Sequence, residues 1–153
     1  MRRLMVLCCA ATLVGCAKKE KTPAADSSSM MTMTPPPATM ADMAGKWTVR
    51  VMPATGDSTL LTYELNATAD TAGWTMTAAG RAPIPLRVSP MVGDSVVIEA
   101  GPYPSLLRKD IQVWTSSVFR QEGGHLVGTT VAHYSVKTAD SVVTLRQDGT
   151  KNP

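Results

Sequence analysis

The 153-residue chain has few of the sequence features that would indicate a specific function. It has three cysteines, Cys8, Cys9 and Cys16, and none after them. No disulfide can therefore form within residues 17–153, and a CxxC redox motif or a cysteine metal site is excluded there. The long apolar run Leu4–Val14 has 11 residues, whereas a membrane-spanning helix needs about 20. Phenylalanine occurs once.

Catalytic and nucleic-acid-binding motifs are also missing. The sequence contains no GxSxG, no HExxH and no glycine-rich phosphate loop. Its two histidines, His125 and His133, share one face of a predicted strand, about 27 Å apart at roughly 3.4 Å per residue, too far to bind one metal. Basic residues do not cluster as nucleic-acid binding requires. We therefore expect a non-enzymatic protein with no metal, no cofactor and no nucleic-acid partner.

The first fifteen residues have the layout of a secretory signal peptide. Arg2 and Arg3 precede the apolar run Leu4–Val14, which only Thr12 interrupts. We expect residues 1–15 to be removed. Without Arg2 and Arg3, 13 of the 15 basic residues remain against 12 acidic ones, so the net charge falls from +3 to about +1.

The end of this segment reads Leu13-Val14-Gly15-Cys16, which resembles the lipobox of bacterial lipoproteins. The resemblance implies cleavage before Cys16, a diacylglyceryl group on its thiol, and acylation of the new amine by a chain such as palmitate. Several acyl chains anchor a protein stably where one is marginal. Ala17 follows instead of the Asp that retains some enteric lipoproteins in the inner membrane, which favours the outer membrane. The alternative is an ordinary signal peptide with an incidental cysteine.

Composition divides the remainder of the chain in two. Residues 16–44 predict a disordered, lipidated linker, because Pro, Ser, Thr and Ala dominate them and no aromatic residue is present. The folded domain is predicted over residues 45–150, about the size of a single domain. We expect it to be monomeric.

The domain alternates polar and apolar residues with the period of β-strands, and no stretch shows sustained helical periodicity. Eight strands are predicted, near residues 46–51, 61–66, 74–78, 84–88, 96–100, 111–120, 125–134 and 141–147. Short sequential strands favour an all-β, up-and-down antiparallel barrel, because closure removes exposed sheet edges. A β-sandwich is the alternative. Pro83 and Pro85 indicate an edge, a bulge or a strand start in the fourth strand.

Gly45-Lys46-Trp47 opens the domain with a GxW element. This element is similar to the first-strand motif of lipocalins and related calycin barrels, and the strand count extends the likeness over residues 45–150. The resemblance implies that Trp47 plugs the closed end of a barrel. It also implies a basic residue packed over Trp47 from the last strand, here Arg146, through a cation–π contact. The lipocalin TDY-type motif is absent, and Trp47 as a plain core aromatic is the alternative.

An eight-stranded barrel is either filled by its own side chains or holds one small ligand. We expect an anchored, extracytoplasmic protein that binds a small apolar or amphipathic molecule through Tyr63, Trp74, Met76, Tyr103 and Trp114. The alternative is a structural or protein-interaction module of the cell envelope with no pocket. Residues 101–110 are longer than a hairpin needs, and Leu106 and Leu107 within them predict either a lid over one mouth or a loop that completes the core.

Overall fold

The computed structural model describes residues 38–153, which belong to one compact unit. Apart from a helical turn, α1 (Met40–Met43), and a 3-10 turn, η1 (Ala139–Ser141), its regular elements are strands. The predicted all-β class is therefore confirmed. The predicted signal peptide, the lipobox with Cys16, and most of the linker lie outside the described residues.

Between residues 38 and 153, no helix is long and apolar enough to cross a membrane.

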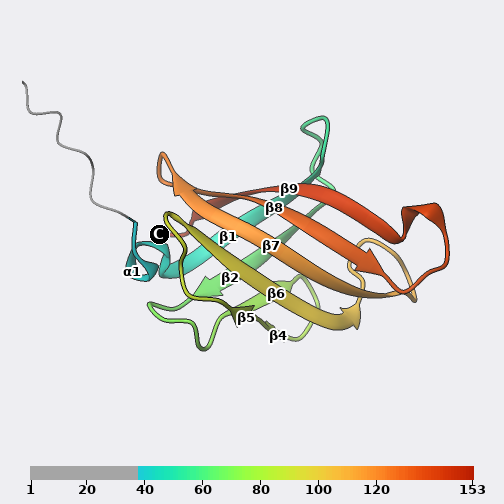
Figure 1. The fold of residues 1–153 in the computed structure, drawn as a ribbon, viewed down its shortest axis with the longest axis horizontal. Helices are drawn as coiled ribbons and strands as arrows, with labels where there is room; N and C mark the ends of the chain where they lie inside the picture. Colours follow the sequence, from blue (N-terminus) through green and yellow to red (C-terminus); the bar gives the residue numbers. More distant parts are fainter. Residues whose placement is uncertain (1–37) are drawn as a thin grey trace, which may run out of the picture. The chain divides into compact units, whose positions relative to one another are not determined.

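Nine antiparallel strands form a single sheet in the order β4-β3-β2-β1-β9-β8-β7-β6-β5, shown in Figure 1. The strands are β1 (Gly45–Pro53), β2 (Leu61–Ala67), β3 (Thr75–Ala78), β4 (Ile84–Pro85), β5 (Arg87–Val88), β6 (Ser95–Pro104), β7 (Gln112–Glu122), β8 (His125–Tyr134) and β9 (Val142–Lys151). The first long strand pairs with the last, β1 with β9. The sheet thus curls into a nearly closed up-and-down barrel, and the sandwich alternative is wrong.

The ninth strand arises because the predicted fourth strand, residues 84–88, changes partner halfway. Its first half, β4, pairs with β3, and its second half, β5, pairs with β6. Between them, the Leu86 N–H donates to the Trp74 carbonyl at 3.0 Å. Pro85 has no N–H and cannot donate to a ladder. This short segment is the seam of the barrel, where the predicted edge prolines lie.

Strand alternation determines which side chains fill the interior. Trp47, Val49 and Leu65 are at most 1% exposed, as the period-2 pattern predicts. Inward packing also explains Gly128 in β8, since a Cβ there would lie 2.6 Å from Cδ1 of Phe119. The lone phenylalanine therefore occupies space that only a glycine opposite it provides.

The two ends of the barrel differ in how they are closed. At the closed end, Met43, Trp47 and Trp74 are almost completely buried, and Trp47 Nε1 donates to the Met43 carbonyl at 2.8 Å. The other end, the mouth, carries the β6–β7 and β8–β9 connections (Figure 1). The helical turn α1, which lies just before the predicted domain start at residue 45, thus packs on Trp47. At the other terminus, the Asn152 N–H still donates to the Lys46 carbonyl.

We predict that Trp47→Ala lowers the free energy of unfolding by about 3–5 kcal/mol, because it empties the closed end. Trp114→Ala is the matched control, since Trp114 lies on the outer face of β7 with its ring 4.9 Å from that of His133. Its expected cost is under about 1 kcal/mol. Urea unfolding followed by circular dichroism measures both, and equal losses would contradict the plug assignment.

Candidate functional site

The candidate site is a cavity inside the barrel, on the mouth side of the closed end. Its volume is about 60 Å³, which is room for roughly four to six water-sized groups. Inward-facing residues of β1, β2, β3, β6, β7, β8 and β9 form its wall, together with Leu86 of the seam. Among the described residues, this wall includes no carboxylate, histidine, lysine or arginine. The cavity therefore suits an uncharged group.

A row of polar side chains crosses the otherwise apolar interior, and we call it the polar rail. The Tyr63 hydroxyl donates to Gln147 Oε1 at 2.7 Å, and Gln147 Nε2 donates to Thr130 Oγ1 at 2.5 Å. Thr130 Oγ1 lies 2.7 Å from Ser117 Oγ. Within residues 38–153, no buried side-chain nitrogen or oxygen lacks a hydrogen-bond partner. The rail thus gives the cavity one polar side whose groups are held in place.

Burial raises the pKa of both cavity tyrosines. Desolvation raises the pKa of Tyr63 well above its ordinary value; Tyr103 raises it further, and the hydrogen bond with Gln147 opposes both. Desolvation also raises the pKa of Tyr103, against a hydrogen bond with Thr115 and with a smaller contribution from Tyr134. Both side chains are phenols rather than phenolates at physiological pH.

Three of the five predicted pocket residues, Tyr63, Met76 and Tyr103, line the cavity. Tyr103 does so because the pairing of β6 with β7 shifts register between Ala100 and Tyr103. Ala100 faces inward, and simple alternation would turn Tyr103 outward. Two residues of β6, 101 and 102, stand opposite the single residue 114 of β7, and this one extra residue turns Tyr103 into the barrel, as a β-bulge does.

The other two predicted residues do not line the cavity. Trp74 is 1% exposed and its Nε1 donates to the Asp70 carbonyl at 2.7 Å, so it belongs to the closed end. Trp114 points outward, because its neighbours Val113 and Thr115 line the cavity. Large side chains occur on both faces of β7, so the alternation of polar and apolar residues did not show which face of this strand points into the barrel.

The predicted loop closes the mouth with its leucines. Leu106 and Leu107 line the cavity, and Leu106 also packs against the core. The buried Ser105 holds the loop, because its Oγ accepts the Leu107 and Arg108 N–H groups at 3.1 and 2.9 Å. The lid and core-completing interpretations thus describe one arrangement, in which the loop both covers the cavity and contacts the core.

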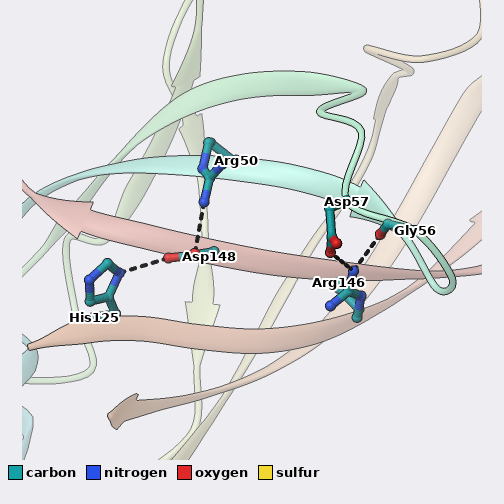
Figure 2. A network of polar contacts seen from close by, with 6 residues as sticks. All are labelled: Arg50, Gly56, Asp57, His125, Arg146 and Asp148. Atoms are coloured by element: carbon teal, nitrogen blue, oxygen red, sulfur yellow. Dashed lines mark hydrogen bonds and ion pairs between the residues drawn. The ribbon is translucent and has the colours of Figure 1, made fainter. Parts of the chain in front are cut away.

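The structure does not bring the two residues of the predicted barrel-closing pair, Trp47 and Arg146, together. Arg146 does not reach Trp47; its guanidinium donates to the Pro53 carbonyl. It also donates to the Gly56 carbonyl and pairs with Asp57 at 2.8 Å, and Figure 2 shows these two contacts. Lys151 lies over Trp47 instead, with Nζ 5.3 Å from the ring centroid. The reason is register: β9 continues to Lys151, which pairs with Trp47, whereas Arg146 points outward near the first turn.

The backbone conformation accounts for the glycine of the GxW element, and Lys151 passes close to it. Gly45 has a φ of +134°, and a Cβ there would lie 2.7 Å from Lys151 Cε. The lysine stem therefore passes directly over Gly45. This contact links the start of β1 to the end of β9 at the closed end.

A second polar network lies on the outer surface of the barrel. Figure 2 shows Asp148 between Arg50, at 2.9 Å, and His125, at 3.0 Å. The hydrogen bond from His125 is the largest cause lowering the pKa of Asp148. Arg50 lowers it further, and desolvation opposes both.

In the part of the chain that the structure describes, no three His, Cys, Asp or Glu side chains gather as a metal site would require.

Comparison with known proteins gives no match: no family model, no curated protein and no solved structure is similar to the chain. The cavity, the polar rail and the mouth are therefore the features from which a function can be inferred.

We predict that Tyr63→Phe destabilises the fold by about 1–3 kcal/mol at pH 7, because Gln147 Oε1 loses its donor. Because the pKa of Tyr63 is raised in the folded chain, the Tyr63 hydroxyl loses its proton at a lower pH in the unfolded chain than in the folded one. The free energy of unfolding therefore falls as the pH rises above about 10, the ordinary pKa of tyrosine. Tyr63→Phe should make this alkaline loss less steep. Urea unfolding at pH 7 and above pH 10 measures both effects.

The control is Tyr63→Phe combined with Gln147→Leu. Replacing both partners of a hydrogen bond with apolar groups is close to neutral, so the double variant should recover part of the stability lost at pH 7. Additive losses in the double variant would contradict the coupling of these two side chains.

Proposed function

We propose that the chain is a lipid-anchored, extracytoplasmic, non-enzymatic binding protein whose barrel takes up a small apolar or amphipathic molecule. The observation that carries the proposal is the cavity, because it combines an apolar wall, one polar side and a loop over its mouth. Binding rather than catalysis is favoured because no carboxylate, histidine, lysine or arginine of the described residues reaches this wall. Burial raises the pKa of the Tyr63 and Tyr103 phenols.

Cavity size restricts the ligand. Pockets for drug-sized molecules have volumes of about 300–1,000 Å³, several times the 60 Å³ here. The occupant is therefore either a molecule of a few heavy atoms or the short apolar end of a larger molecule that extends through the mouth. The second case requires the loop carrying Leu106 and Leu107 to adjust.

A structural or interaction module of the envelope is the second candidate. The observations that favour it are the small cavity and the absence of unpaired buried polar side-chain atoms among residues 38–153. A barrel filled in this way needs no ligand for stability.

Filling the cavity separates the two functions. Ala132 lines the cavity, whereas Ala78 is an inward residue of β3 that does not. We predict that the purified chain carries a co-purifying small molecule in native mass spectrometry, that Ala132→Leu removes it, and that Ala78→Leu retains it. Both variants add the same volume, with similar overpacking costs of about 1–3 kcal/mol. A bare wild-type mass, with no adduct from a panel of small amphiphiles, would favour the structural module.

The anchor is supported by the order of a signal-peptide-like segment and a lipobox-like motif, with Cys16 as the modified residue. We predict that Cys16→Ser abolishes incorporation of radiolabelled palmitate and moves the protein from the membrane fraction to the soluble fraction. Cys8→Ser and Cys9→Ser are matched controls in the removed segment, and each should leave labelling unchanged. Palmitate labelling that survives Cys16→Ser would contradict the lipoprotein assignment.

A further inference from the structure

One cation lies close to the cavity at the mouth. Arg108 directly follows Leu106 and Leu107, which line the cavity. Its Cζ is 4.0 Å from the centroid of the Tyr134 ring, and Tyr134 also lines the cavity. The Arg108 guanidinium is therefore separated from the interior by a single aromatic ring. Stacking on that ring gives it a fixed position.

The present partner of Arg108 is a carboxylate on the neighbouring connection. Arg108 Nη1 lies 2.9 Å from Asp140 Oδ2, and the Asp140 side chain is 62% exposed against 25% for Arg108. Asp140 is held for this contact by Thr138, whose hydroxyl donates to Oδ1 at 2.5 Å. The ion pair thus joins the β6–β7 loop to the β8–β9 connection across the mouth. Exposed ion pairs contribute little to stability, so exchanging one carboxylate for another costs little.

The guanidinium has the chemistry to accept an incoming anion. Its planar fork carries five N–H donors and matches a carboxylate in a two-point contact. The pair with Asp140 uses Nη1 alone. The cavity wall has no charged group of its own among the described residues, so a ligand's charge has to remain at the mouth while its apolar part enters.

We propose that Arg108 recognises the carboxylate head group of an amphipathic ligand whose short apolar tail occupies the cavity, with the head group displacing Asp140. This proposal rests on the proposed binding function and narrows it to small anionic amphiphiles. The neighbouring Lys109 is exposed and does not stack on Tyr134. The proposal therefore assigns recognition to Arg108 and not to any positive charge on this loop.

The test compares hexanoate and 1-hexanol, which share a six-carbon skeleton and differ in the charge of the head group. Affinities for the purified full chain are measured by NMR chemical-shift titration. A charge-assisted contact corresponds to about tenfold in affinity, so hexanoate should bind about tenfold more tightly than 1-hexanol. Arg108→Gln should remove this preference without weakening 1-hexanol binding, and Lys109→Gln, the matched loss of charge, should retain it.

Asp140→Asn distinguishes recognition of the head group by Arg108 from a purely structural role of the Arg108–Asp140 ion pair. It removes the competing carboxylate, so hexanoate affinity should rise, by up to about fivefold, while 1-hexanol affinity stays the same. Arg108→Lys, which keeps the charge, should retain part of the preference and guards against a folding defect in Arg108→Gln.

The outcomes separate the two proposals. Equal binding of hexanoate and 1-hexanol by the wild-type chain, or equal effects of Arg108→Gln and Lys109→Gln, overturns the role of Arg108 and leaves the cavity as a binding site. Binding of neither compound overturns the role of Arg108, and the native mass spectrum of the wild-type chain then decides the binding function separately. A hexanoate preference that Arg108→Gln abolishes and Asp140→Asn strengthens supports both.

Discussion

The fold depends on the pairing of its first long strand with its last. Without the β1–β9 ladder, the chain would form two open sheets, β4 to β1 and β9 to β5, each with a long unpaired edge. That pairing joins residues about a hundred positions apart, such as Trp47 and Lys151. The entropy of closing so long a loop has to be overcome before the contact contributes. The buried side chains around Trp47 and the strand hydrogen bonds together provide the compensation.

The same closure decides what the interior can hold. Gln147 of β9 and Tyr63 of β2 lie on either side of β1, and the hydrogen bond that Gln147 accepts from Tyr63 is possible only once β1 has paired with both strands. Phe119 and Gly128 then fill the middle of the barrel, and the indoles fill the closed end. What remains is a small space below the β6–β7 loop, and its shape follows from these larger side chains.

The sequence predicted the parts of this structure that depend on local alternation. The eight apolar runs, the barrel class, the burial of Trp47 and the inward position of Tyr63 all follow from period-2 patterns. Tyr103, Trp114 and Lys151 depend on register, which alternation does not determine. A bulge reversed the facing of β6 before Tyr103, and the extra length of β9 placed Lys151 rather than Arg146 over the indole. The polar rail was missed because Ser117, Thr130 and Gln147 are ordinary polar strand residues until the barrel brings them together.

The position of the chain ends gives the molecule a direction. β1 begins and β9 ends beside Trp47, and α1, through which the preceding residues enter the fold, packs on the same indole. The described part of the chain therefore both starts and ends at the pole opposite the mouth (Figure 1). Under the proposed function, the barrel is attached at this pole and exchanges ligand at the mouth. The proposal then implies that the length of the connecting segment sets the reach of the barrel and not its affinity for a ligand.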